Sequence, residues 1–364
     1  MPKTALLFEK IDALVDELIF SSDDASVLSS SRPARKMLAL FMSLKKPFEK
    51  RILETFAAGH DDTITKLLTD LFKSKTSLPY FQSMISLSYF YWNWIRQYKL
   101  KLSPQQIDEL TLSLIYGAIG YKLLDTFCDD STATSDKNLI SNAQMLYISK
   151  YLIAHQEATL ARHFNNAILF ANVQGKYNRL FCDFGIRELA CKYKSSPIDA
   201  ADSIHLGYKS APLMLYFALG LGACGQEQRI PDYERIFFLT TSSIQIHDDI
   251  FDAMDDLLHG NITLITRDFV DTIDYAGLIK QPEELKKAFA RFLETTGADI
   301  ALFKIAQANL EEALEICHQY SDNIFELFIE SKLLGVLEKI NRREALHEES
   351  QRQKSAAHHQ GKDR

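Results

Sequence analysis

One stretch of this 364-residue chain carries carboxylates at a spacing that could bind metal ions. Five aspartates lie between Asp248 and Asp256, and no lysine or arginine occurs between Ser242 and Gly260. Because each residue of an α-helix turns by about 100°, five polar side chains of this stretch fall within one narrow arc. They are Gln245, Asp248, Asp249, Asp252 and Asp256. Their oxygens suit Mg²⁺, which favours one or two carboxylates together with water and phosphate oxygens.

An acidic helical face also occurs on helices that simply face water. Such a helix usually gains stability by placing a basic residue four positions from an acidic one. Here the residues four positions after Asp248 and Asp252 are Asp252 and Asp256, so the neighbours repel one another. Bound cations would remove this repulsion, and a second acidic element elsewhere in the chain would favour the metal-binding interpretation.

A second pair of acidic residues lies at the end of an earlier predicted helix. Ser103, Pro104 and Gln106 form a helix start, with Ser as the cap and Gln three residues after it. The helix is predicted to end soon after Asp129, and it carries Asp125 and Asp129 on one face among apolar neighbours. Without a counter-ion, each such carboxylate loses on the order of several kcal/mol of hydration. The two acidic elements are therefore explained most simply if they face each other across metal ions.

Composition and periodicity predict an all-α protein. Apolar residues make up 46% of the chain, enough for a large core, and they recur at helical spacing with no run of alternating strands. The 14 glycines and 9 prolines are few for this length, which favours long uninterrupted helices. The net charge of −7 argues against nucleic acid as a partner. We therefore predict a single helical domain without a nucleic-acid partner.

The cysteines and the apolar runs predict a cytoplasmic protein without a membrane span. The five cysteines are odd in number and include no Cys-x-x-Cys pair, which is typical of reduced core cysteines. Charged residues interrupt the N-terminal stretch, so no secretory segment is expected there. The longest apolar run, residues 211–224, is short for a bilayer.

Several predicted helices would position the two acidic elements. The helix that carries the aspartate-rich stretch is predicted to begin at Pro231 and to stop at Gly260. Another begins at Pro282, and the remaining predictions are residues 139–163, 176–194, 208–223, 301–320 and 323–340. We expect three parts in the chain: N-terminal helices of unassigned role (1–101), a helical bundle (102–344) and a polar, disordered tail (345–364).

Basic residues between the two acidic elements are candidates for binding an anion. Lys209 is the single lysine at the head of a long apolar helix, where it could neutralise an anion at the mouth of a cavity. Arg179 and Arg187, together with Lys176, form another basic set. Each of these residues also fits an ordinary solvated surface charge.

These motifs resemble the trans-isoprenyl diphosphate synthases (polyprenyl synthetases) and their class I terpene synthase relatives, which share the all-α isoprenoid synthase fold. Residues 245–252 match the second aspartate-rich motif of that family, and residues 125–129 take the position of the first. Residues 208–211 resemble the Lys-Thr-Ala/Gly segment that precedes the second motif. The similarity covers roughly residues 110–268. The second motif is specific, and the first is degenerate.

The resemblance implies a cofactor, a substrate and roles for the site residues. Three Mg²⁺ ions would bridge the two motifs and the diphosphate of an allylic prenyl diphosphate. The implied metal ligands are Asp125, Asp129, Asp248 and Asp252, with Asp249 in support. Lys209 would contact the diphosphate, Gln245 would face the developing carbocation, and Tyr121 lies where family members set the depth of the cavity. Arg179 and Arg187 are the further candidates for binding substrate, and a homodimer is implied by resemblance alone.

Departures from the family pattern bear on which reaction follows ionisation. Chain-elongating members bind isopentenyl diphosphate with basic segments on both sides of the first motif. The residues directly after Asp130 (131–138) contain no arginine pair, and the best candidates for the earlier segment, Arg32 and Arg35, lie far before Asp125. Thr126 also replaces the usual second aspartate, and Asn261 stands where a diphosphate-binding lysine is common.

The missing cations favour a reaction with one substrate. Each charge-assisted contact that a site lacks costs roughly 1.5–3 kcal/mol of binding. We therefore predict a Mg²⁺-dependent terpene synthase of the prenyl-synthase-like type, which ionises a prenyl diphosphate and releases a hydrocarbon or alcohol. Two alternatives stay open: a chain-elongating prenyltransferase, and a non-catalytic partner subunit of such a synthase.

Overall fold

The computed structural model describes residues 102–129, 142–192, 200–320 and 323–360, together with positions 54, 66, 91 and 100. Every element in these ranges is a helix, so the all-α prediction is confirmed for the part of the chain that is described. The N-terminal helices predicted within residues 1–101, and with them Arg32 and Arg35, lie outside it. The chain divides into two compact units, one of residues 1–170 with 219–225 and one of residues 171–218 with 226–364.

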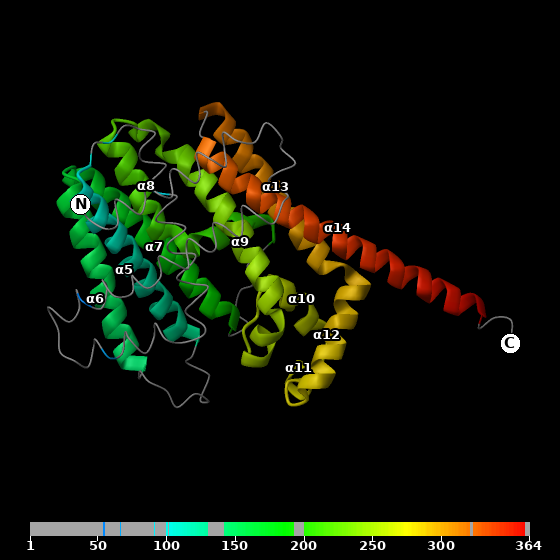
Figure 1. Ribbon diagram of the computed structural model, residues 1–364. Coiled ribbons are helices and arrows are strands. Elements are labelled where there is room, and N and C mark those ends of the chain that lie inside the picture. Colours follow the sequence, from blue (N-terminus) through cyan, green and yellow to red (C-terminus); the bar gives the residue numbers. More distant parts are fainter. Residues whose placement is uncertain are drawn as a thin grey trace. The chain divides into compact units, whose positions relative to one another are not determined.

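The helices follow one another along the chain as labelled in Figure 1. They are α5 (Pro104–Asp129), α6 (Asn142–His163), α7 (Ala167–Lys192), η3 (Ala200–Ser210), α8 (Ala211–Ala223), η4 (Glu227–Arg229), α9 (Ile230–His259), α10 (Leu264–Thr272), α11 (Tyr275–Leu278), α12 (Pro282–Thr296), α13 (Ala298–Tyr320) and α14 (Asn323–Gln360). The two η elements are 3-10 helices.

The start of α5 has the predicted capping box. The backbone N–H of Ser103 donates to Gln106 Oε1 at 2.8 Å, and the backbone N–H of Gln106 donates to Ser103 Oγ at 3.2 Å. Two N–H groups that the first turn would otherwise leave unpaired are thereby satisfied. The cap fixes the beginning of the helix that carries the first acidic element.

In the first unit α5 packs closely against α6 through two glycines. A Cβ atom at Gly117 would lie 2.1 Å from the side chain of Gln156, and one at Gly120 would lie 2.9 Å from Ile153 Cγ1. Ser149 Oγ donates to the carbonyl oxygen of Gly120 at 2.8 Å. The absence of a side chain at Gly120 is therefore explained by the approach of α6.

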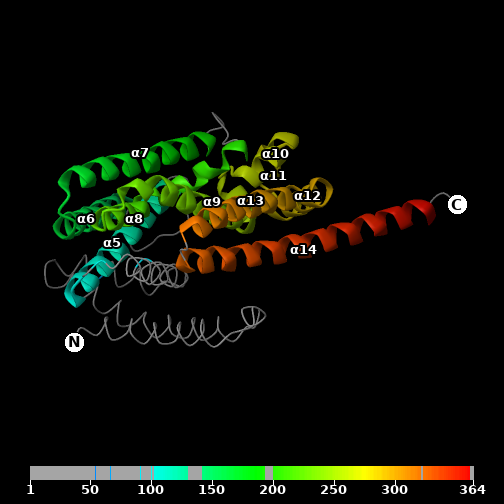
Figure 2. The same ribbon diagram turned by 90° about the horizontal axis from the view of Figure 1, so that it is seen from above.

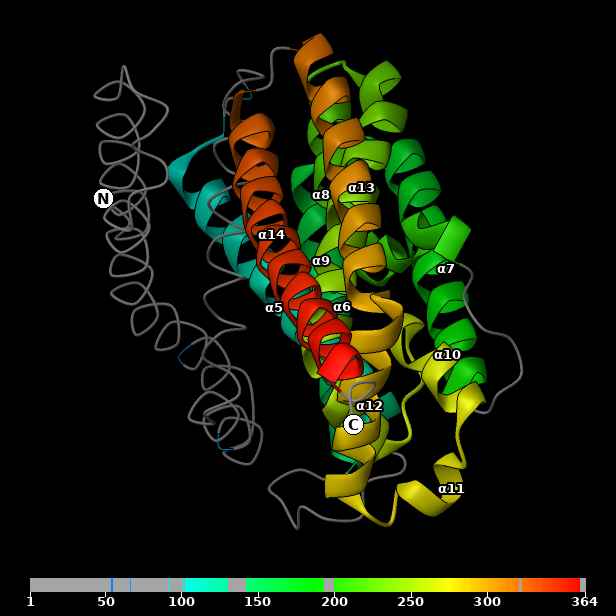
Figure 3. The same ribbon diagram turned by 90° about the vertical axis from the view of Figure 1, so that its right-hand side faces the viewer.

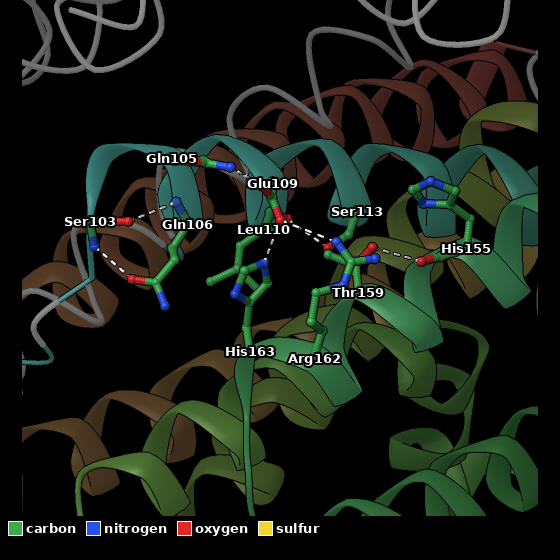
Figure 4. A network of polar contacts seen from close by, with 10 residues as sticks. All are labelled: Ser103, Gln105, Gln106, Glu109, Leu110, Ser113, His155, Thr159, Arg162 and His163. Carbon is green, nitrogen blue, oxygen red and sulfur yellow. Dashed lines mark hydrogen bonds and ion pairs between the residues drawn. The ribbon is translucent and has the colours of Figure 1, made fainter. Parts of the chain in front are cut away.

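A polar cluster links the first turns of α5 to the last turn of α6 (Figure 4). Glu109 accepts a hydrogen bond from Gln105 Nε2 at 2.9 Å, lies 2.8 Å from His163 Nε2 and pairs with Arg162 Nη1 at 3.4 Å. The hydrogen bond from Gln105 and the charges of His163 and Arg162 hold the pKa of Glu109 below its ordinary value. These contacts tie the two helix ends together.

In the second unit α9 packs against η3 and against α13. Small polar side chains of α9 permit the close approach on both sides. Ser242 Oγ donates to the carbonyl oxygen of Ser203 in η3 at 2.5 Å, and Ser243 Oγ donates to the carbonyl oxygen of Ala306 in α13 at 3.0 Å. Because these hydroxyl groups are buried and bonded, they fix how α9 is rotated about its own axis.

The ends of α9 agree with the sequence prediction. Pro231 occupies the first turn, and Gly260 follows the last helical residue with φ 78°. The backbone N–H of Gly260 bonds to the carbonyl oxygens of Asp256 and Leu257. A side chain at this left-handed position would be strained, so glycine is the residue that ends the helix cleanly.

The last helix differs from the prediction. α14 continues through the polar stretch that we expected to be disordered from residue 345, and it is helical as far as Gln360. This stretch is rich in Ala, Glu, Gln, Lys and Arg, which all favour helix, and a shortage of apolar residues does not oppose helix formation. α14 lies beside α13 (Figure 3), joined by ion pairs of Arg343 with Asp299 (3.1 Å) and Lys304 with Glu344 (2.7 Å). Beyond these pairs it continues past α13 (Figure 2).

Candidate active site

The acidic arc of α9 lies across the boundary between core and surface. Asp249 is buried, with 8% of its surface exposed, whereas the Asp248 side chain is 60% exposed. Asp252 is exposed, and Gln245 and Asp256 are half-buried. The tertiary packing around α9 therefore divides a set of residues that the helical spacing alone places together.

Asp249 is held by Gln245 inside this arc. Gln245 Nε2 donates to Asp249 Oδ1 at 2.6 Å. Burial raises the pKa of Asp249 to about 7, against the lowering effects of this hydrogen bond and of the positive charge of Lys209. The negative charges of Asp256 and Glu188 raise it further. Gln245 therefore acts here as the hydrogen-bond donor that orients a buried carboxyl group.

Burial of Asp249 predicts a pH dependence of stability. A carboxyl group whose pKa rises on folding favours the protonated, folded form, so without Mg²⁺ the free energy of unfolding should fall between pH about 4 and about 7. Asp249→Asn has no carboxyl group to ionise at this position, so its free energy of unfolding should not fall for this reason over that pH range. It should be more stable than the wild-type protein at pH 8, by up to about 4 kcal/mol, and the difference should vanish near pH 4. Urea unfolding at both pH values measures this. A difference that does not grow with pH would contradict it.

Lys209 is brought to the acidic arc by η3. The sequence predicted Lys209 at the head of the apolar helix, but it lies in the last turn of η3, before α8 begins at Ala211. Its Nζ is 3.3 Å from Glu188 Oε1 of α7, and its charge acts on Asp249. Lys209 and Asp249 thus belong to one polar group at the junction of η3, α7 and α9.

A glycine permits this approach. A Cβ atom at Gly207 would lie 2.4 Å from the carbonyl oxygen of Phe238 in α9 and 2.9 Å from Thr241 Oγ1. Distances below 3.0 Å cannot be accommodated unless the helices separate, and the nearest atom belongs to the backbone. Gly207 therefore sets the distance between Lys209 and the acidic arc.

Substitution of Gly207 should separate η3 from α9. Gly207→Ala is expected to lower the free energy of unfolding by about 1–3 kcal/mol, as overpacking does. Gly175→Ala in α7 is the matched control, since a Cβ atom there meets nothing within 4 Å. That variant should gain about 0.5–1 kcal/mol from the change of glycine to alanine within a helix. Urea unfolding measures both. Equal effects at the two positions would contradict the close packing at Gly207.

The other basic residues that the sequence suggested lie on α7. Lys176 Nζ contacts both carboxylate oxygens of Glu234, at 2.5 and 2.6 Å, and the buried Tyr177 hydroxyl donates to Glu234 at 2.7 Å. Lys176 therefore helps to join α7 to α9. Arg179 and Arg187 are exposed, and their role in binding substrate stays a prediction.

The first acidic element lies at the end of α5, in the other unit. The Asp125 side chain is 13% exposed, and Lys122 Nζ lies 2.9 Å from its Oδ2 atom. Asp129 is the last residue of α5, but its side chain is outside the described part of the structure. Tyr121 is half-buried one turn before Asp125. The joint action of the two acidic elements on one substrate remains a prediction.

Comparison with known proteins identifies the fold. No protein-family model matches the chain, and no curated protein matches it in sequence. Among solved structures, it is similar to geranylgeranyl pyrophosphate synthase from Lactobacillus brevis, with a TM-score of 0.62 and 16% identity over 79% of this chain and 95% of that one. Octaprenyl pyrophosphate synthase from Helicobacter pylori gives 0.55 and 14% over 82% and 99%, and geranylgeranyl pyrophosphate synthetase from Geoglobus acetivorans gives 0.57 and 14% over 82% and 98%. The chain has the fold of the trans-isoprenyl diphosphate synthases.

The donors that α9 presents suit Mg²⁺ within this prenyl synthase fold. Within the described ranges, no three His, Cys, Asp or Glu side chains are grouped closely enough to enclose a metal ion. Mg²⁺ does not require an enclosed site, because it retains water and takes one or two carboxylates together with phosphate oxygens. Asp248 and Asp252, one helical turn apart and both exposed, are ligands of this kind.

Sequence reasoning missed three charged residues that the prenyl synthase fold places around α9. Glu188 pairs with Lys209 and directly follows Arg187 in the sequence, yet nothing local marks it. Lys332 and Lys339 come from α14, more than seventy residues after the aspartates. Only the packing of α14 beside α9 and α13 brings them there.

In the described part of the chain, no helix is both long and apolar enough to span a membrane.

Proposed function

We propose that the protein is a Mg²⁺-dependent prenyltransferase that condenses an allylic prenyl diphosphate with isopentenyl diphosphate. One observation carries this proposal: the acidic arc of α9, with Lys209 held beside it, occurs in a fold whose similar structures are geranylgeranyl and octaprenyl pyrophosphate synthases. This reverses the preference drawn from the sequence, where the chain-elongating reaction was the alternative.

The residues of the second unit support distinct parts of such a reaction. Bound Mg²⁺ would supply the Lewis acid that stabilises the departing diphosphate. Asp248 and Asp252 would hold it through their exposed carboxylates, with Asp125 and Asp129 as the proposed ligands from α5. Lys209 would exchange the Glu188 carboxylate for a diphosphate oxygen, with which its ammonium group would form a charge-assisted hydrogen bond. Gln245 keeps the buried Asp249 oriented beside them.

A terpene synthase remains the second candidate because of one feature of the sequence. No arginine pair occurs in residues 131–138, directly after Asp130, so the chain lacks that source of cations for a second diphosphate. The two reactions share the ionisation step and the same metal ligands. They differ only in whether the carbocation meets isopentenyl diphosphate or reacts alone.

We also propose the homodimer that the resemblance implies, which light scattering of the purified protein would test.

A product assay separates these functions. The purified protein is given geranyl, farnesyl or geranylgeranyl diphosphate with Mg²⁺, each with and without isopentenyl diphosphate. We expect a longer prenyl diphosphate that forms only when isopentenyl diphosphate is present. A hydrocarbon or alcohol from one substrate alone would establish the terpene synthase instead. Absence of any product would contradict both and would favour a non-catalytic partner subunit.

A further inference from the structure

Side chains from α13 and α14 meet on the surface of α9 beside the acidic arc. Lys339 Nζ of α14 lies 3.9 Å from the centroid of the Phe251 ring. The same ring stacks on His247, one helical turn earlier on α9, with 4.5 Å between the ring centroids. His247 in turn meets Phe303 of α13 in a T-shaped contact, with 6.2 Å between centroids. These four residues join three helices, and we call them the ring stack.

The ring stack reaches the exposed member of the aspartate pair. His247 Nδ1 lies 3.6 Å from Asp248 Oδ1. This distance is longer than a hydrogen bond, but an imidazole N–H and a carboxylate still attract each other over it. Asp248 is exposed, so burial does not restrict its side chain as it restricts that of Asp249. His247 is therefore a neighbour that can limit the orientations of the Asp248 carboxylate.

The two ends of the ring stack hold His247 in place. Phe303 is buried in the core, with 1% of its surface exposed, and it contacts His247 from α13. Phe251 is 59% exposed, so burial alone does not fix its ring. Lys339 is half-buried over this ring, and the attraction between an ammonium group and an aromatic face grows as water is excluded. Lys339 thus anchors Phe251 from α14, and Phe251 supports His247.

The buried member of the aspartate pair has a support of the same kind. Gln245 Nε2 donates to Asp249 Oδ1 at 2.6 Å and orients that carboxyl group. Neighbours that orient a metal ligand generally affect the affinity for the metal as well. Gln245 supports the buried side of the arc, and the ring stack lies beside its exposed side.

We propose that His247 is a positioning residue for Asp248. Lys339 holds His247 in place through the ring of Phe251. This rests on the function proposed above, in which Asp248 binds Mg²⁺, and it adds α14 to the elements that support the site. An exposed aspartate loses rotamer freedom when it binds a metal ion, and a neighbour that already restricts the carboxylate reduces this loss. Loss of the ring stack should therefore weaken the binding of Mg²⁺.

The competing interpretation is that Lys339 acts only through its positive charge. Such a charge repels Mg²⁺ and attracts an anion. Lys339→Gln would then strengthen Mg²⁺ binding, and it would weaken diphosphate binding at every Mg²⁺ concentration. Phe251→Leu would have no effect, because it changes no charge. Positioning predicts instead that both substitutions weaken Mg²⁺ binding.

Calorimetric titration of the full-length protein with inorganic diphosphate, at low and at saturating Mg²⁺, distinguishes the two. At low Mg²⁺ we expect His247→Phe, which keeps a ring but loses Nδ1, to bind diphosphate about tenfold more weakly. Phe251→Leu and Lys339→Gln should each lose about two- to fivefold, the contribution of one exposed cation–π contact. These losses should shrink to within about twofold at saturating Mg²⁺, because excess metal fills a weakened site.

Two further variants serve as controls. Lys339→Arg keeps a cation over the Phe251 ring and should stay within about twofold of wild type at both Mg²⁺ concentrations. Lys304 of α13 pairs with Glu344 of α14 at 2.7 Å. Lys304→Gln therefore removes one positive charge and one contact between α13 and α14, but it leaves the ring stack intact. It should also stay within about twofold of wild type.

Each outcome decides the proposal. Unchanged or tighter binding by His247→Phe or Phe251→Leu at low Mg²⁺ would overturn the positioning role and leave the proposed function intact. A loss that persists at saturating Mg²⁺, or an equal loss in Lys304→Gln, would do the same. Wild-type protein that binds no diphosphate with Mg²⁺ would overturn the proposed function and this inference together. Thermal unfolding shows that each variant is folded, and the comparison of Lys339→Gln with Lys339→Arg tests the stack independently of the ring substitutions.

Discussion

Asp248→Asn is expected to lower Mg²⁺-dependent turnover of an allylic prenyl diphosphate by at least about a hundredfold. An amide keeps the size of the side chain but loses the negative charge that binds the cation. Metal stabilisation of a leaving oxygen contributes several kcal/mol, and each 1.36 kcal/mol corresponds to about a tenfold change in rate. The side chain is 60% exposed, so the substitution should leave the fold unchanged. Initial rates at saturating Mg²⁺ measure the effect.

The control for this variant is an acidic residue of the same unit outside the arc. Asp271 is exposed near the end of α10, and Asp271→Asn changes the net charge by the same amount. It should retain the wild-type rate within about twofold, because an exposed charge outside the site interacts weakly with it. If Asp248→Asn were as active as Asp271→Asn, the assignment of Asp248 as a metal ligand would be wrong.

Asp125→Asn is expected to cause a loss of similar size, about a hundredfold, if the first acidic element acts on the same substrate. The double variant Asp125→Asn, Asp248→Asn then tests whether the two aspartates act together on one substrate. When two residues act as one unit, the double variant loses little more activity than the more severe single variant does. When they act independently, the two losses multiply. We therefore expect a double-variant rate close to the lower single-variant rate.

The control at the first element separates the carboxylate from its ion pair. Lys122 pairs with Asp125 at 2.9 Å and is half exposed. Lys122→Gln removes the pair but keeps the carboxylate, so it should remain active. A product of the two single losses, of the order of 10⁴, would mean that Asp125 and Asp248 act independently. Full activity of Asp125→Asn would remove α5 from the site.

Local signals in the sequence predicted the helices and their ends. Apolar periodicity gave the all-α fold, the Ser103 to Gln106 box marked the start of α5, and Pro231 and Gly260 marked the ends of α9. Each of these signals works within a few residues, through caps, fixed φ angles or one helical turn. For this reason a single sequence was enough to read them.

The burial and the neighbours of the site residues depend on long-range packing, which the sequence did not predict. Helical spacing placed Asp248 and Asp249 in one arc, but in the folded protein only the second of them is buried. The place of Lys209 depends on a glycine that meets a backbone carbonyl thirty-one residues later, Gly207 against Phe238. Lys339 lies over the Phe251 ring of α9 only because α14 packs beside that helix. None of these contacts can be predicted from the residues that neighbour them in the sequence.

The most direct test of the central claim is the release of inorganic diphosphate. Wild-type protein is incubated with geranyl, farnesyl or geranylgeranyl diphosphate, with and without isopentenyl diphosphate, in Mg²⁺ and in parallel with a chelator. The account predicts release from at least one of these mixtures that stops when Mg²⁺ is removed and is lost in Asp248→Asn. No release from any of them, or release that continues in the chelator, would contradict an active site built on the acidic arc of α9.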